Sequence, residues 1–181
     1  MTTPWTITPE WQGQTVAVFA SGPSMSQELA DQLRATCDRT IAVNGTHVLA
    51  PWADMAVSLE PYWHPEYNGF AGMRVIGVDV PEIDALYIGP RWETVHLGPG
   101  NIIEIRNSGV TAVRVAALMG AARIVLAGFD YPYRTGHFYD DEVDTGQYPG
   151  LLQAMDALVA ELRASGVVVD FAEVAAEEDG Q

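Results

Sequence analysis

Short apolar runs alternate along this chain with longer helical patterns, and this alternation limits most strongly how the chain can fold. Strands are predicted at Thr15–Ala20, Thr40–Val43, Met55–Leu59, Arg74–Val78, Thr94–Leu97, Arg123–Ala127 and Val167–Val169. Helical spacing predicts helices at Ser26–Thr36, Ser108–Met119 and Gly150–Ala164. The runs are continuously hydrophobic, as in parallel strands that are covered on both faces. We therefore expect an α/β fold: a Rossmann-like open, mostly parallel sheet with helices on both faces.

The chain of 181 residues is the size of one domain. We expect residues 15–172 to form it, after an N-terminal extension at 1–14 and before an acidic tail at 173–181. Residues 131–149 follow no period and are rich in aromatic residues, which predicts a short irregular lid over the domain. Parallel strands would bring the ends of the first, second and sixth predicted strands together, with Ser21, Asn44 and Asp130 around one crevice.

The composition excludes several classes of protein. A net charge of −15 leaves no basic stripe for duplex DNA, although arginines in the middle of the chain could form a local basic pocket: Arg91, Arg106, Arg114, Arg123 and Arg134. No signal peptide and no apolar run of about 18 residues is present, which predicts a cytoplasmic protein with no membrane contact. The single Cys37 and the scattered histidines offer no transition-metal site.

A glycine-containing turn, Ser21-Gly22-Pro23-Ser24, follows the first predicted strand. Gly22 permits close approach of the backbone, and Ser24 or Ser26 can cap the next helix, with Ser24 and Gln27 fitting a capping box. A helix N-terminus offers free N–H groups to an anion, which predicts a phosphate-binding turn here. The alternative is an ordinary connection between a strand and a helix. The turn is not a P-loop, because no Gly-Lys-Ser/Thr follows it.

Three further segments extend this motif: Ile41-Ala42-Val43-Asn44, Asn107-Ser108-Gly109-Val110-Thr111, and the strand that ends in Gly128-Phe129-Asp130-Tyr131. The order of the four segments resembles the bacterial sialyltransferase-like glycosyltransferases, which use CMP-activated sugars. It is also similar to their relatives, the 6-hydroxymethylpterin pyrophosphokinase-like and flagellin-modification (motility accessory factor) proteins. The resemblance covers roughly residues 15 to 170.

The resemblance implies a set of nucleotide-binding residues: Ser21, Gly22, Pro23, Ser24, Asn44, Ser108, Gly109, Gly128, Asp130 and Tyr131. Two features depart from the family. Ser21 stands where the family often has Asn, and Gln147-Tyr148 precede the last helix where the sialyltransferases place a catalytic His. His137 in the lid and His64 in the other irregular segment are therefore the candidate catalytic bases.

Three functions remain open. The first is a small glycosyltransferase with a CMP-type donor. The second is a pyrophosphokinase, for which the acidic lid residues would hold Mg²⁺: Asp140, Asp141, Glu142 and Asp144. The third is a non-catalytic nucleotide-binding module, which would suit a phage-encoded accessory or anti-defence protein. The aromatic segment Glu60–Tyr67 would stack on a base or sugar, or would pack at a subunit contact in a homo-oligomer.

Overall fold

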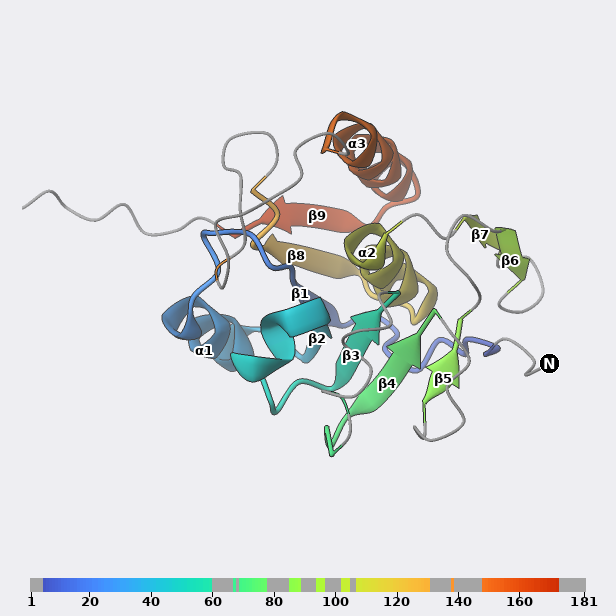
Figure 1. The fold of residues 1–181 in the computed structure, drawn as a ribbon. Coiled ribbons are helices and arrows are strands. Elements are labelled where there is room, and N and C mark those ends of the chain that lie inside the picture. Colours follow the sequence, from blue (N-terminus) through green and yellow to red (C-terminus); the bar gives the residue numbers. More distant parts are fainter. Residues whose placement is uncertain are drawn as a thin grey trace, which may run out of the picture.

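The main sheet has seven parallel strands in the order β5-β4-β3-β2-β1-β8-β9 (Figure 1). A computed structural model describes residues 5–59, 67, 69–77, 85–88, 94–96, 102–104, 107–130, 138 and 148–172. The strands of the main sheet are β1 (Thr15–Phe19), β2 (Arg39–Val43), β3 (Met55–Ser58), β4 (Met73–Ile76), β5 (Leu86–Tyr87), β8 (Arg123–Ala127) and β9 (Val168–Phe171). The Rossmann-like α/β fold expected from the sequence is confirmed.

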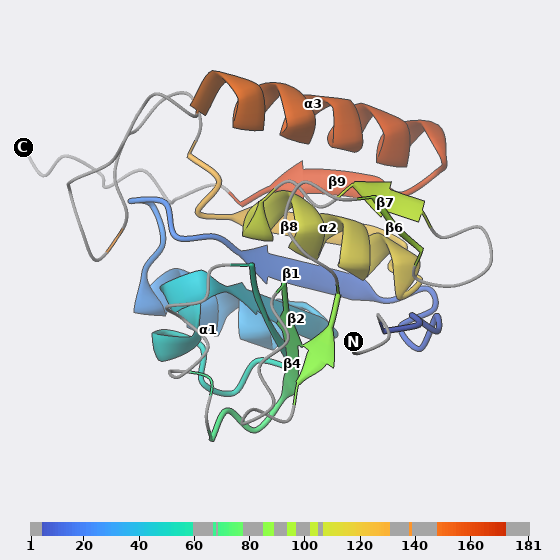
Figure 2. The same cartoon turned by 45° about the vertical axis from the view of Figure 1, so that its right-hand side comes forward.

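Helices cover both faces of this sheet, and alternate side chains of each strand supply the two cores. Val16 and Val18 of β1 pack in the core that contains residues of α2 (Ser108–Leu118) and α3 (Tyr148–Ala164). Ala17 and Phe19 point the other way, into the core with α1 (Gln27–Thr36). In Figure 2, α2 and α3 lie on one side of the sheet and α1 lies on the other.

The predicted elements match the observed ones to within two residues at most ends, but their pairing differs in one place. The predicted strand at Thr94–Leu97 forms β6 (Thr94–His96), which pairs antiparallel with β7 (Ile102–Glu104) in a separate two-stranded sheet. Only residues 97–101 separate these strands, whereas a parallel pair needs a crossover of a dozen residues or more. The strands β5 and β7 and the 3₁₀ helix η1 (Asn44–Val48) were not predicted.

The start of α1 corrects the predicted capping box. Ser26 is the N-cap, and its side chain accepts a hydrogen bond from the N–H of Leu29. Gln27 does not reach back to Ser24, because its amide donates to Asp31 along the helix. The backbone N–H of Ser24 is itself bonded to Asp130, so Ser24 belongs to the turn and the helix begins beyond it.

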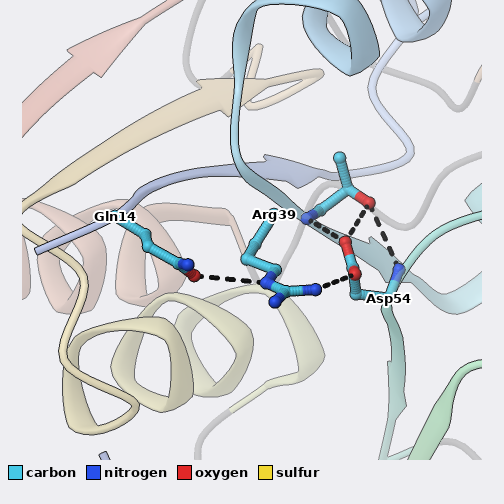
Figure 3. A network of polar contacts seen from close by, with 4 residues as sticks. Gln14, Arg39 and Asp54 are labelled. Carbon is cyan, nitrogen blue, oxygen red and sulfur yellow. Dashed lines mark hydrogen bonds and ion pairs between the residues drawn. The ribbon is translucent and has the colours of Figure 1, made fainter. Parts of the chain in front are cut away.

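A polar network joins the amino ends of β1, β2 and β3, as Figure 3 shows. Arg39 donates to Gln14 at 3.2 Å and to Oδ1 of Asp54 at 2.9 Å. The other oxygen of Asp54 accepts from the N–H and the hydroxyl of Thr40 at 2.9 and 3.0 Å. These bonds satisfy polar groups at the edge of the sheet that lies away from the candidate site.

Within the described ranges, none of the helices combines the length and apolar character that are needed to cross a bilayer. The same residues contain no group of three or more His, Cys, Asp or Glu side chains that could hold a metal ion. The predicted lid, apart from Phe138 and the first residues of α3, lies outside the described residues, and so does the acidic tail.

Candidate site at the carboxyl edge of the sheet

The strand order reverses between β1 and β8. From β1 the chain continues through β2 to β3 in one direction, while β8 and β9 lie on the other side of β1. Open α/β sheets bind their ligands beyond the carboxyl ends of the strands at such a reversal. The edge is on the left of Figure 2, where the chain leaves β1 and β8. As expected, the ends of β2, β1 and β8 lie side by side, followed by Asn44, Ser21 and Gly128–Asp130.

The segments that follow β1 and β8 interlock through two glycines. The N–H of Gly22 donates to the carbonyl of Gly128 at 2.9 Å. A Cβ on Gly22 would lie 2.3 Å from that carbonyl oxygen and 2.1 Å from Oδ2 of Asp130. Gly128 has a φ of +70°, and a Cβ there would lie 2.2 Å from the carbonyl oxygen of Ala20. Both positions therefore require glycine, because any side chain would meet backbone atoms of the other segment.

The backbone of the turn is hydrogen-bonded within the protein. Gly22 N–H is bonded to Gly128, Pro23 has no N–H, Ser24 N–H donates to Oδ2 of Asp130 at 2.9 Å, and Met25 N–H donates to the carbonyl of Gly22 at 3.0 Å. The carboxylate of Asp130 thus lies directly on the turn. It is half-buried, and its other oxygen has no hydrogen bond within the described part of the chain.

Asn44 follows β2 with a backbone in the left-handed region, at a φ of +52°, and is the one non-glycine residue with positive φ among those described. Its backbone carbonyl accepts from Nδ1 of His47 at 2.9 Å and from the hydroxyl of the fully buried Tyr67 at 3.2 Å. Its side-chain Oδ1 is buried without a hydrogen-bond partner in the described structure. Asn adopts this conformation more readily than most residues do. The two hydrogen bonds to its backbone carbonyl hold Asn44, and with it the side chain, at the carboxyl edge of the sheet.

The N-terminus of α2 lies over the same edge. Asn107 is its N-cap and accepts from Val110 N–H at 2.7 Å. The hydroxyl of Ser108, a residue only 2% exposed, accepts the N–H of Leu59 at the end of β3, at 2.9 Å. At Gly109 a Cβ would lie 3.1 Å from the ring of Phe129, which follows β8. The helix start is therefore held between the ends of β3 and β8.

The two helix starts at this edge differ in charge. The first turn of α1 contains Glu28, whereas the first turn of α2 contains no acidic residue. Because a carboxylate at a helix N-terminus competes with an incoming anion for the same dipole, α2 is better suited than α1 to face one.

Two arginines that the sequence offered for a basic pocket are paired elsewhere. Arg114 forms a bidentate pair with Glu161 between α2 and α3. Arg123 starts β8, at the opposite edge of the sheet, and pairs with Asp170 at 2.8 Å. Arg91, Arg106 and Arg134 lie outside the described residues.

One residue of the predicted lid is described. Phe138 donates its backbone N–H to the carbonyl of Ser21 at 3.0 Å, and its side chain packs against the core beneath α1. The segment after β8 therefore returns to the turn after β1. Tyr131 and both candidate bases, His137 and His64, lie outside the described residues, as does the acidic run Asp140–Asp144.

Sequence reasoning missed several residues that shape this edge. Tyr67 and His47 hold the carbonyl of Asn44, and Phe129 contacts the first turn of α2. The hydroxyl of Thr46 bonds to the carbonyl of Phe19 at 2.9 Å and so joins η1 to the end of β1. A polar or aromatic residue just after a predicted strand was a usable signal for Thr46, His47 and Phe129. Tyr67 ends the aromatic segment Glu60–Tyr67 that the sequence singled out, but no local pattern predicted its hydrogen bond to Asn44.

Comparison of the sequence with models of protein families, and with curated proteins, found no match.

Proposed function

We propose that this protein binds a nucleotide or nucleotide-sugar at the carboxyl edge of its sheet, around the ends of β2, β1 and β8. The observation that carries the proposal is the reversal of strand order at the interlocked Gly22 and Gly128, because ligands of open α/β sheets bind at that point. The N-terminus of α2 supports it, since its first turn lacks acidic residues and lies over the same edge.

The resemblance to sialyltransferase-like enzymes favours a CMP-type donor and transfer of its sugar. In that reaction a base takes the proton of the acceptor hydroxyl, whose oxygen forms a bond to the anomeric carbon. The bond from that carbon to the phosphate oxygen breaks, and the nucleotide leaves with the electron pair. His137 or His64 would be the base. N–H groups at the start of α2 would stabilise the charge on the departing phosphate.

A ligand screen by thermal shift tests the binding step. Cytidine nucleotides, CMP-sugars and ATP are compared, each with and without Mg²⁺. A ligand at 100 times its dissociation constant adds about 2.7 kcal/mol to the free energy of unfolding. We expect CMP or a CMP-sugar to stabilise the wild type, and Arg39→Met, at the opposite edge, to respond equally. If none of these ligands raises the melting temperature, the proposed function is wrong.

Donor turnover then separates the three functions. A transferase predicts that His137→Ala or His64→Ala lowers turnover sharply while donor affinity changes little, because the base acts on the acceptor. A pyrophosphokinase predicts that Asp140→Asn and Asp141→Asn weaken Mg²⁺-dependent binding of ATP. A binding module predicts no turnover, with affinity that falls in Ser108→Ala or Asn44→Gly.

A further inference from the structure

The backbone N–H groups from Gly22 to Met25, in the turn after β1, are not available to a ligand. Of its four residues from Gly22 to Met25, three donate their N–H inside the protein and Pro23 has none. A phosphate cradle needs free N–H groups that converge on the anion. These four residues therefore offer no backbone donor that could hold a phosphate.

The carboxylate of Asp130 adds a charge that opposes phosphate at this place. Its Oδ2 is 2.9 Å from the N of Ser24 and 2.1 Å from the position that a Cβ of Gly22 would take. A phosphate at the turn would sit in contact with this carboxylate, and like charges repel strongly at such distances. The protein thus supplies its own anion to the turn.

Two side-chain acceptors at the edge have no hydrogen-bond partner among the described residues. Oδ1 of Asp130 accepts no hydrogen bond within the described residues, and Oδ1 of Asn44 is buried without a partner there. The strands that carry them, β8 and β2, flank β1 and are two strand spacings apart, about 10 Å. A ligand that satisfies these acceptors has to donate hydrogen bonds, as hydroxyl and amino groups do.

We propose that Asp130 is a specificity-determining residue that takes the ribose hydroxyls of the nucleotide and excludes its phosphate from the turn after β1. The inference rests on the proposed nucleotide site and assigns its parts: the sugar lies against Asp130, and the phosphate lies toward α2. A carboxylate accepts from two neighbouring hydroxyls at once, and hydrogen bonds to a charged acceptor are about twice as strong as neutral ones.

Calorimetric titration of the full chain with four probes tests this assignment: CMP, cytidine, 2′,3′-dideoxycytidine and inorganic phosphate. We expect cytidine to bind the wild type at least ten times more tightly than dideoxycytidine, and phosphate at millimolar concentration not to displace it. In Asp130→Asn the amide oxygen still accepts from Ser24, but the charge is gone. The preference for the hydroxyls should then fall severalfold, and phosphate should begin to compete.

Asp156→Asn is the matched control, because it removes one exposed carboxylate on α3 and leaves the edge intact. It should behave as the wild type with all four probes. Equal binding of cytidine and dideoxycytidine to the wild type would overturn the role of Asp130 while leaving the nucleotide site standing. The role of Asp130 would also be overturned if phosphate displaced cytidine from the wild type as readily as from Asp130→Asn. Failure of CMP and cytidine alike to bind would contradict the proposed function itself.

Discussion

Gly22 and Asp130 lie in such close contact that a Cβ on the glycine would be 2.1 Å from Oδ2 of the aspartate. The two residues are far apart in the sequence and meet because β1 and β8 are neighbours in the sheet. Their contact joins the two segments that leave the carboxyl edge at the strand reversal. The same arrangement that leaves no room for a side chain on Gly22 also places a carboxylate at the candidate site.

Gly22→Ala should therefore lower stability markedly. The added methyl group meets the backbone carbonyl of Gly128 as well as Asp130, so rotation of one side chain cannot relieve the contact. Forcing an extra group into a packed site costs about 1–3 kcal/mol, which urea unfolding resolves. Gly150→Ala is the control: a Cβ there meets nothing within 4 Å, and Ala in a helix is favoured by about 0.5–1 kcal/mol. Equal stability of the two variants would show that the close contact is absent.

Replacing Asn44 in two ways should separate backbone strain from loss of the side chain. Asn44→Ala keeps a Cβ at a φ of +52°, which costs an ordinary L-residue about 1–2 kcal/mol. Asn44→Gly loses the same amide group without that strain. We expect the alanine variant to unfold at a lower urea concentration than the glycine variant, and both to lose the same affinity for nucleotide. A glycine variant with undiminished affinity would exclude the Asn44 side chain from the site.

The strands β1, β2, β3 and β8 were predictable because each is a mainly apolar run that is buried along nearly its whole length. The turn of Gly22 and the acidic end of β8 could also be placed, since polar residues after such runs fall at the carboxyl edge. The two-residue β5 is too short to form a pattern, and β7 pairs outside the main sheet.

The side-chain partners at the site were not predictable. Ser24 pairs with Asp130 across 106 residues, and Ser108 pairs with Leu59 across 49. The local sequence allowed either Ser24 or Ser26 to cap α1. In the structure the N–H of Ser24 is bonded to the distant Asp130 carboxylate, and Ser26 is the cap. The same long-range bond engages the N–H of Ser24, one of the groups in the predicted phosphate-binding turn.

The polar network at the amino ends of β1, β2 and β3 should lose more stability when Asp54 is replaced than when Arg39 is replaced. Asp54→Ala leaves the N–H and hydroxyl of Thr40, a residue only 4% exposed, without their acceptor, which should cost about 1–3 kcal/mol. Arg39→Met removes a partly exposed ion pair and leaves the bonds of Thr40 intact, so its cost should stay below about 1 kcal/mol. Urea unfolding of both variants checks the order. A larger loss from the arginine would contradict this account.

The pair of Arg114 and Glu161 should make stability depend on pH in one direction. Hydrogen bonds from Arg114 hold the pKa of the Glu161 carboxyl below its ordinary value of 4.5. A carboxyl with a lowered pKa in the folded state stabilises the protein fully above its unfolded pKa, and that contribution is lost as pH falls through the folded pKa. Because the Glu161 side chain is 59% exposed, the pair should contribute only about 0.2–1 kcal/mol.

Unfolding of the wild type and of Glu161→Gln is measured at pH 7 and at pH 3, which lie on either side of the sequence pI of about 4.3. The difference in free energy of unfolding between the two proteins gives the contribution of the pair. The variant should be less stable at pH 7, and the difference should shrink toward zero at pH 3. Added salt should reduce it at pH 7, because exposed charges are screened. Asp156→Asn, an exposed carboxylate on the same helix, controls for the loss of one negative charge from a chain of net charge −15. A stability difference for Glu161→Gln that is the same at both pH values would mean that the helices are joined by packing alone.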